Sequence, residues 1–450
     1  MADLDAIFKA YDIRGTTPDQ LDEPTARAIG AAFARFVQAQ EGGAERVLVG
    51  RDMRPSGVGL AAAFADGVMA QGLDVVDLGL CSTDLVYYAA GALDAPAVML
   101  TASHNPAQYN GMKLCLSGAR PIGADSGLQE IKAMAAAGVP DGPTRGRRTE
   151  QDLLADFAAH VRSFVDPSVL RPLKVVADTA NGMGGLVVPA VFEGLPFELE
   201  LLYPELDGTF PNHPADPIQP ENLRDLQARV LETGADVGLA FDGDADRVFL
   251  VDETGTPLSG SVTTAIVAAG VLEKEPGATI LYNCICSKTV PEVIRERGGT
   301  PVRTKVGHSY IKAVMAETGA AFGGEHSAHY YFRDNYRADS GSIAALVVLE
   351  QLCRAGESLS VLRKPFDRYA ASGEINTRVD DPQAVIEAVA AAFPADAQDR
   401  LDGLTVDMGD WWFNLRASNT EPLLRLNLEA PDPEACAAHV AEVQALMAAV

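Results

Sequence analysis

Short apolar runs alternate with Ala-rich segments along the first 80% of the chain. Residues 47–50 form an apolar run, and a polar loop, a helix-like stretch over 57–71 and a second apolar run over 74–78 follow it. This order is typical of a strand, loop, helix, strand unit. It recurs over residues 174–203 and 279–304. The repeats predict three tandem, similar α/β domains with mixed sheets, over residues 1–147, 148–252 and 253–366.

The pattern changes after about residue 366. Residues 381–393 favour a helix, with Asp381 as its N-cap and Pro382 at its first position. Residues 411–415 and 423–428 read as strands, and residues 433–450 as an amphipathic closing helix. We therefore predict a smaller α+β domain over residues 367–450.

Each repeat also contains an apolar strand that runs directly into a polar loop. The strands span residues 97–100, 237–240 and 320–322, and the loops span 101–106, 242–247 and 323–329. In α/β sheets, ligand-binding groups gather in loops at the carboxyl ends of strands. These loops, with the loop at 416–422, are the candidate functional segments.

Three aspartates alternate in the second loop, at Asp242, Asp244 and Asp246. Carboxylates at this spacing can converge on a hard divalent cation. A calcium EF-hand also begins in this way, but Arg247 stands where an EF-hand needs glycine, and strands flank the loop where an EF-hand needs helices. The alternative is a solvated acidic turn, which needs neither three spaced aspartates nor the arginine behind them.

Ser103 lies at the tip of the strand in the first loop, because Pro106 cannot continue a sheet. A serine displayed in this way can act as a nucleophile or carry a phosphate. Lys113, a few residues later, can supply positive charge or a proton. By itself the segment would read as a simple Ser or Asx turn. Beside the aspartate loop, a functional reading is favoured.

The third and fourth loops carry groups that suit a sugar phosphate. Glu325 and Ser327, two residues apart, can face one side and bind a vicinal pair of sugar hydroxyls. His329 and the segment from Lys305 to His308 are further polar candidates. The fourth loop offers a guanidinium, hydroxyls and an amide for a phosphate dianion, namely Arg416, Ser418, Asn419 and Thr420.

The composition restricts the partners. The chain has 450 residues, 36 Lys and Arg against 62 Asp and Glu, and a net charge of −26. Such an acidic chain should repel nucleic acids and anionic membrane surfaces. We expect no membrane span, because no apolar run is long enough, and no export signal, because residues 1–15 contain acidic residues and no apolar core. The six cysteines are scattered along the chain, which suits a reducing compartment, and we therefore expect a cytoplasmic protein. Cys284 and Cys286 are expected on a buried strand. The protein is expected to be a monomer or a dimer.

These loops, in this order, resemble the α-D-phosphohexomutase superfamily, and most closely its phosphomannomutase/phosphoglucomutase group. The resemblance runs from residues 8–15, FKAYDIRG, and residues 50–52, GRD, to the loop at 416–422. It implies four domains around a central cleft. It also implies an isomerase that interconverts hexose 1-phosphate and hexose 6-phosphate, of mannose or glucose or both, with hexose 1,6-bisphosphate as intermediate and activator.

The same resemblance implies a role for each candidate. Ser103 would be phosphorylated, and Mg²⁺ would be bound by Ser103, Asp242, Asp244 and Asp246. The reacting end would be lined by Tyr11, Arg14, Lys113, Arg247, His308 and His329. The substrate's hydroxyls and phosphate would be held by Lys305, Glu325, Ser327, Arg416, Ser418, Asn419 and Thr420.

Two positions depart from the pattern of this group. Ala328 stands where relatives usually have glycine, and its methyl group is expected to require a negative φ. Ile285 stands where several relatives place a lysine in the cleft, and Lys288 lies three residues further on.

Other functions remain open on the sequence. They are a mutase for an amino sugar or pentose phosphate, a Mg²⁺-dependent sugar phosphatase, and a non-catalytic phosphosugar sensor. A phosphatase needs a path for water to the phosphoenzyme, which a mutase must exclude, and a sensor would not need Ser103. For an acidic chain with an anionic substrate, we expect positive charge to concentrate locally, on Arg14, Lys113, Arg247, Lys305 and Arg416 with Mg²⁺.

Overall fold

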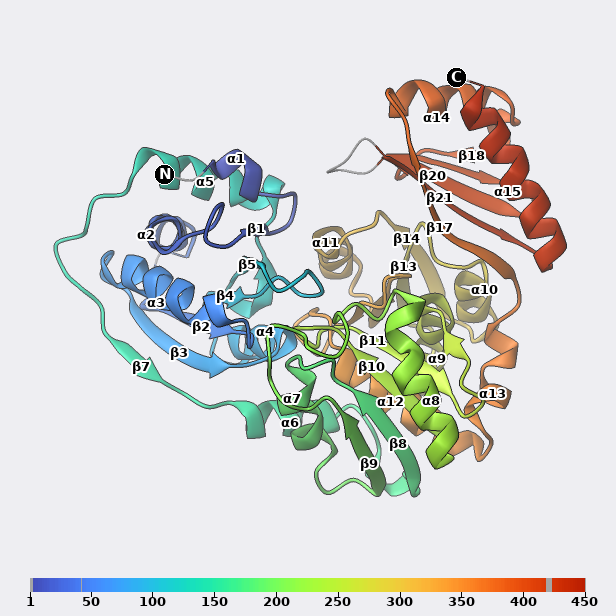
Figure 1. Ribbon diagram of the computed structural model, residues 1–450, viewed down its shortest axis with the longest axis horizontal. Coiled ribbons are helices and arrows are strands. Elements are labelled where there is room, and N and C mark those ends of the chain that lie inside the picture. Colours follow the sequence, from blue (N-terminus) through green and yellow to red (C-terminus); the bar gives the residue numbers. More distant parts are fainter. Residues whose placement is uncertain (1–2, 42, 418–422, 450) are drawn as a thin grey trace. The chain divides into compact units, whose positions relative to one another are not determined.

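The computed structural model describes residues 3–41, 43–417 and 423–449. The chain divides into two compact units, which are described separately. The first comprises Met1–Ser259 and Ser327–Leu362, and the second comprises Gly260–His326 and Arg363–Val450. The predicted fold class is confirmed, because three α/β domains precede a smaller C-terminal domain (Figure 1). The boundaries at 147, 252 and 366 stay predictions.

The first sheet is mixed, as predicted. Its order is β1-β5-β4-β2-β3-β7, and β6 pairs with β5. Strands β2, β3, β4 and β7 run parallel, whereas β5 is antiparallel to β4, and β1 to β5. The strands are β1 (Ile13–Thr16), β2 (Arg46–Arg51), β3 (Asp74–Leu80), β4 (Ala97–Leu100), β5 (Tyr109–Leu116), β6 (Arg120–Pro121) and β7 (Arg148–Glu150). The helices are α1 (Leu4–Ile7), α2 (Glu23–Gln40), α3 (Pro55–Met69), α4 (Thr83–Ala92) and α5 (Leu128–Ala137).

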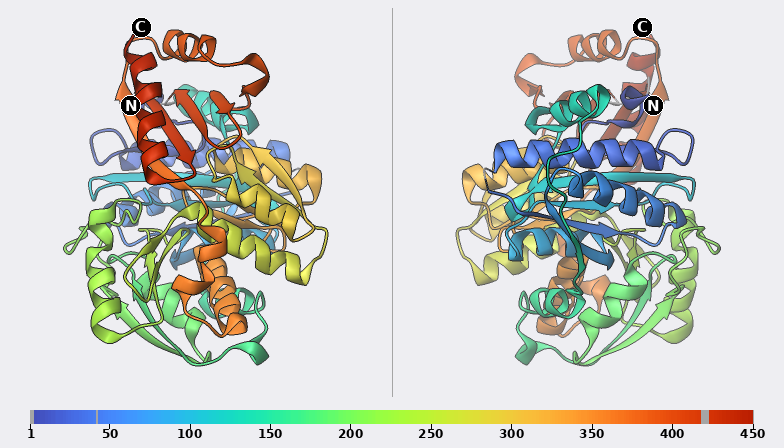
Figure 2. Two further views of the ribbon diagram at one scale, coloured as in Figure 1. Left: turned by 90° about the vertical axis from the view of Figure 1, so that its right-hand side faces the viewer. Right: turned by 90° about the vertical axis from the view of Figure 1, so that its left-hand side faces the viewer.

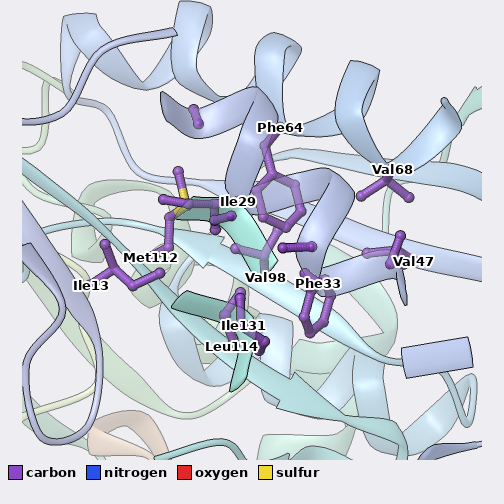
Figure 3. Close-up of a cluster of buried hydrophobic side chains, with 14 of the residues drawn as sticks. Ile13, Ile29, Phe33, Val47, Phe64, Val68, Val98, Met112, Leu114 and Ile131 are labelled. Atoms are coloured by element: carbon purple, nitrogen blue, oxygen red, sulfur yellow. The ribbon is translucent and has the colours of Figure 1, made fainter. Parts of the chain in front are cut away.

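Helices α2 and α3 lie side by side on this sheet and enclose a cluster of buried apolar side chains (Figure 3). The rings of Phe33 and Phe64 are 5.8 Å apart at its centre, and both side chains are fully buried. The helices approach closely at Gly30, where a Cβ would lie 2.2 Å from the carbonyl oxygen of Phe64. Any larger residue at position 30 would push the helices apart.

The rest of the first unit is built on a second mixed sheet, of order β12-β11-β10-β8-β9. An extended connection that contains β7 leads into it from α5 (Figure 2). The strands are β8 (Leu173–Asp178), β9 (Phe197–Leu202), β10 (Val237–Phe241), β11 (Val248–Asp252) and β12 (Pro257–Leu258). The helices are α6 (Leu154–Arg162), α7 (Gly184–Phe192), α8 (Arg224–Thr233), α12 (Gly341–Ala355) and α13 (Leu359–Leu362), and the strand β16 (Tyr330–Phe332) precedes α12 in the chain. Helix α12 packs against α6 and β11, which brings a late segment of the chain against the second sheet.

The second unit contains a parallel arrangement and an antiparallel sheet. Strand β13 (Thr279–Asn283) pairs in parallel with β14 (Thr300–Thr304) and β15 (Phe322–Gly324). Its helices are α9 (Gly260–Lys274), α10 (Thr289–Glu296) and α11 (His308–Thr318). The C-terminal sheet has the order β17-β21-β20-β19-β18, and α14 (Pro382–Ala391) and α15 (Pro433–Ala448) cover one face (Figure 1). Its strands are β17 (Ala370–Arg378), β18 (Gln398–Asp399), β19 (Leu404–Asp407), β20 (Trp412–Ala417) and β21 (Leu423–Ala430). Short 3₁₀ turns span Ser117–Ala119, Ala124–Ser126, Pro167–Val169, Pro220–Leu223, Lys364–Phe366 and Ala395–Ala397.

The predicted elements are present, with shifted ends. Asp381 caps α14 through its side chain and Pro382 is the first helical residue, as expected. Cys284 and Cys286 are buried, but they lie in the turn after β13 rather than on the strand, because the strand ends at Asn283. Within the residues described, none of the helices combines the length and apolar character that crossing a bilayer requires.

Candidate active site

Ser103 lies in the turn between β4 and β5, where the chain reverses. Its side chain is buried, and its φ of 49° is in the left-handed region. That region costs a non-glycine residue about 1–2 kcal/mol, so neighbouring contacts must hold the backbone there. The Ser103 N–H donates to Thr101 Oγ1 at 2.8 Å, and its carbonyl accepts from Arg54 Nη2 at 2.9 Å. The loop therefore presents the serine in one fixed conformation.

Arg54 organises the whole Ser103 loop. It is fully buried, and its side chain forms a salt bridge to Asp52. Its guanidinium donates to four main-chain carbonyls, those of Ser103, Asn105, Pro106 and Tyr109, at 2.6–2.9 Å. Sequence reasoning missed this residue. The one sequence feature that could have indicated Arg54 is its position two residues after the GRD segment at residues 50–52.

The aspartate loop joins β10 to β11 and lies against the Ser103 loop. Ser103 Oγ donates to Asp242 Oδ2 at 2.7 Å. The approach depends on Gly243, since a Cβ there would lie 2.4 Å from the Ser103 carbonyl oxygen. Asp242, Asp244 and Asp246 are all buried, and one carboxylate oxygen from each lies within 4.8 Å of the others. The predicted convergence of the three aspartates and the serine is thus present.

Lys113, on β5, neutralises part of this cluster. Its Nζ lies 2.7 Å from Asp244 Oδ2 and 2.7 Å from Asp246 Oδ2. Burial opposes its charge, but the two carboxylates outweigh burial and hold the pKa of Lys113 well above its usual value. Burial also raises the pKa of Asp246, whereas for Asp244 the contacts of Lys113 overcome burial and lower the pKa. The lysine remains cationic at neutral pH.

The same carboxylates keep oxygens that suit a divalent cation. Among the described residues, Asp244 Oδ1 and Asp246 Oδ1 are buried without a hydrogen-bond partner. A buried carboxylate oxygen without a partner is costly, and Mg²⁺ prefers such oxygen ligands. Asp242, Asp244 and Asp246 therefore fit a hard cation.

Two arginines border Ser103. Arg247 Nε donates to Asp242 Oδ2 at 2.9 Å, and Arg14 Nη1 donates to Asn105 Oδ1 at 2.6 Å. Within the described part of the chain, Arg247 Nη2 and Arg14 Nε are buried and have no hydrogen-bond partner. Guanidinium N–H groups are strong donors to phosphate oxygens. This side of the serine is therefore suited to an anion.

His329 also reaches the aspartate cluster. Ligand-type atoms of His329, Asp246 and Asp339 lie within 4.8 Å of one another. The ring Nδ1 is 3.0 Å from Ser327 Oγ. Tyr11 lies in the loop that leads into β1 and is partly buried. The first unit thus unites Ser103, Arg14, Lys113, Arg247, His329 and the three aspartates.

The remaining candidates lie in the second unit. Glu325 is buried, and its Oε1 accepts from Asn283 Nδ2 at 3.2 Å and from the Gly307 N–H at 3.0 Å. Gly307 separates Lys305 from His308, and Lys305 Nζ lies 5.5 Å from the centre of the Tyr310 ring. Glu325 therefore holds the loop that carries Lys305, a predicted substrate contact, and His308, a predicted catalytic residue. Asn283 was not predicted, and no sequence motif marks it.

Ala328 and the segment of Ile285 and Lys288 are the two places where the sequence departs from the pattern of the related group. The requirement for a negative φ at Ala328 is wrong, because Ala328 is buried with a φ of 65°. The fold holds the residue in the left-handed region at a cost of about 1–2 kcal/mol. Lys288 Nζ binds Asp407 Oδ1 at 2.8 Å and the Gly409 carbonyl at 2.5 Å, so it ties α10 to the C-terminal sheet.

Arg416 is the penultimate residue of β20 and lies beside a carboxylate. Its Nη2 is 3.6 Å from Glu374 Oε2, and Arg425 binds the other oxygen of Glu374 at 3.3 Å. The predicted phosphate ligands Ser418, Asn419 and Thr420 lie outside the described residues.

The fold and this constellation define a sugar-phosphate mutase. Models for phosphoglucomutase/phosphomannomutase domains match the chain in order, with α/β/α domains I, II and III at residues 5–139, 155–255 and 259–369 and the C-terminal domain at 374–446. The chain belongs to the phosphoglucomutase/phosphomannomutase family.

Individual relatives agree with this assignment. The chain is 43% identical over 429 residues to a phosphohexose mutase of Xanthomonas campestris pv. campestris, which covers 94% of each protein. It is 41% identical over 436 residues to a phosphomannomutase of Salmonella montevideo, again over 94% of each. A crystal structure of a phosphoglucomutase/phosphomannomutase family protein from Burkholderia thailandensis matches with a TM-score of 0.91 and 35% identity, covering 100% of this chain and 98% of that one. The chain is therefore a hexose phosphate mutase, an isomerase of carbohydrate metabolism.

Proposed function

We propose that this chain interconverts the 1-phosphate and 6-phosphate of mannose, glucose or both, through a phosphoserine at Ser103 and a bisphosphorylated sugar. The observation that carries the proposal is the Ser103 hydroxyl, which donates to Asp242 inside a buried cluster of three carboxylates bordered by Lys113 and Arg247. A hydroxyl in this setting is displayed for phosphoryl transfer, whereas a binding protein has no need of it.

Asp242, Asp244 and Asp246 would hold Mg²⁺, with Ser103 completing the site. When bound, Mg²⁺ supplies neutralisation of the charge that develops on a transferring phosphoryl group. Lys113 donates to the Oδ2 atoms of Asp244 and Asp246, which would leave their Oδ1 atoms for the cation. Arg247 and Arg14 have N–H groups on the side of Ser103, where they would hold the phosphate.

In the proposed reaction, the bond from phosphorus to Ser103 Oγ breaks and a bond forms to the free hydroxyl of the sugar monophosphate. The hydroxyl proton passes to a base, for which His308 and His329 are candidates with the right chemistry. The bisphosphate then turns end for end and returns its other phosphoryl group to Ser103. In this second transfer the bond from phosphorus to the sugar oxygen breaks, that oxygen takes the proton back from the base, and the bond from phosphorus to Ser103 Oγ forms again, so that atoms and charge balance.

Recognition of the sugar is assigned to the other candidates. Glu325 and Ser327 would bind hydroxyls, and Lys305 and Tyr11 would line the substrate. Arg416, with Ser418, Asn419 and Thr420, would hold the phosphate that does not react. Mannose and glucose differ at C2, and these residues need not read that position, so one chain would accept both.

The test of the phosphoserine is chemical. Intact-mass measurement and peptide mapping should find one phosphate on Ser103, and Ser103→Ala should abolish turnover while keeping sugar-phosphate binding. Ser117→Ala is the matched control, because Ser117 is a polar serine of the same domain that bonds to Glu41. An unmodified Ser103 with full activity in Ser103→Ala would overturn the mechanism.

The substrate is tested by a coupled assay with mannose, glucose and glucosamine 1-phosphates, each with hexose 1,6-bisphosphate present. We expect mannose and glucose phosphates to react at comparable rates and glucosamine phosphate to react poorly. Release of inorganic phosphate is followed in the same samples. A rate of release equal to the mutase rate would favour the phosphatase alternative instead.

A further inference from the structure

Thr83 stands at the first position of α4 and faces the aspartate loop. It is fully buried, and sequence reasoning gave it no role. Its Oγ1 donates to Asp244 Oδ2 at 2.5 Å, and its N–H donates to the Asp244 carbonyl at 3.0 Å. Thr83, from the first domain, therefore donates hydrogen bonds to both the side chain and the main chain of Asp244, from the second domain.

The position of Thr83 at the start of a helix explains why its N–H can donate to Asp244. The first N–H groups of a helix have no partner within the helix. Ser82 caps α4 by accepting from the Leu85 N–H, which leaves the Thr83 N–H to bond outside. The positive end of the helix dipole also favours a carboxylate at this position.

The contacts of Asp244 divide its two oxygens. Oδ2 accepts from Thr83 and from Lys113, whereas Oδ1 is buried with no hydrogen-bond partner among the described residues. Rotation of the carboxylate would break both bonds to Oδ2. The pair therefore holds the carboxylate in one orientation and leaves Oδ1 as the oxygen available to a ligand.

We propose that Thr83 is a positioning residue for Asp244, which it orients so that Oδ1 serves as a ligand to the divalent cation. The proposal rests on the metal site proposed above. Groups that orient metal ligands typically contribute 10–100-fold in metal affinity. Because Thr83 contacts Asp244 and lies outside the substrate groups, its loss should change cation binding more than sugar-phosphate binding.

The test measures Mn²⁺ binding by calorimetry and electron paramagnetic resonance, on chains that keep Ser103 and whose phosphorylation has been matched by intact-mass measurement. Thr83→Val removes the hydroxyl at nearly constant volume and should weaken Mn²⁺ binding about 10–100-fold. Thr83→Ser keeps the hydroxyl and should restore the affinity. Thr25→Val is the matched control, since Thr25 is buried in the first domain, and its Oγ1 has no hydrogen-bond partner among the described residues.

The outcomes separate the two proposals. If the parent chain binds no Mn²⁺, or Asp244→Asn binds as well as the parent, the metal site itself is wrong. If the parent binds and a folded Thr83→Val binds equally well, the role of Thr83 is wrong. Should Thr83→Val not fold, Thr83→Ala is read in the same way. In activity assays, Thr83→Val should need a higher Mg²⁺ concentration for half-maximal rate than the parent chain, whereas its KM for the sugar phosphate should stay near that of the parent.

Discussion

Replacement of Gly243 by alanine tests whether the close approach of two loops is required for activity. The added Cβ would lie 2.4 Å from the Ser103 carbonyl oxygen, and ordinary contact begins at 3.4 Å, so the loops must separate by about 1.0 Å. A separation of that size would stretch the bond from Ser103 Oγ to Asp242 Oδ2 from 2.7 Å to about 3.7 Å, beyond hydrogen-bond range. A misplacement of about 1 Å costs about 10²-fold in rate, or about 2.7 kcal/mol.

The assay is the coupled conversion of mannose 1-phosphate at saturating Mg²⁺, with folding checked by circular dichroism. Gly57→Ala is the control, since its nearest neighbours would be at 3.8 Å, and alanine in helix α3 should be neutral or stabilising by up to about 1 kcal/mol. A folded Gly243→Ala chain with an unchanged kcat would refute the argument that this contact sets the geometry of Ser103.

Three further predictions concern Arg54, His213 and Asp402. In Arg54→Lys, a single ammonium group cannot reach all four carbonyls of the Ser103 loop. Calorimetry should therefore show that the free energy of unfolding falls by about 1–3 kcal/mol for each carbonyl left unpaired. An unchanged melting temperature and kcat would contradict this prediction. Burial by itself would lower the pKa of His213, but the hydrogen bond to Asp178 outweighs burial, and the net pKa is raised. The protonated histidine therefore stabilises the fold fully below about pH 6.5, and this stabilisation is lost as pH rises through the raised pKa. The difference in melting temperature between wild type and His213→Gln should shrink toward pH 8.5, and a constant difference would contradict the prediction. Asp402 Oδ2 accepts from the Val306 N–H at 3.0 Å, in the loop that carries Lys305 and His308, so Asp402→Ala should raise the KM for sugar phosphate by the equivalent of about 0.5–1.5 kcal/mol. Asp407→Ala, which instead loses the bonds from Lys288 and from the Gly409 N–H, should leave the KM unchanged.

The sequence identified the groups that carry chemistry because their types and spacing are local. Three aspartates at alternate positions and a serine before a proline are visible within six residues each. The α/β class was also predictable, since the apolar runs repeat with a regular order. The ends of the elements were less predictable, as at Asn283, because strands end where pairing ends rather than where apolar residues do.

What holds those groups could not be read from local patterns. Thr83 and Asp244 are 161 residues apart, and nothing near Thr83 in the sequence indicates a partner in the second domain. Ala328 shows the converse: a local rule predicted a negative φ, yet the fold imposes a positive one. Strain of this kind is tolerated where many contacts determine the backbone, as at Ser103, whose carbonyl, amide and hydroxyl are all bonded. The chemistry of this site therefore depends on residues that look ordinary in sequence. Substitutions at Thr83, Arg54 and Gly243 should separate orientation from chemistry more cleanly than substitutions of the aspartates, because each changes the position of the proposed ligands without removing any of them.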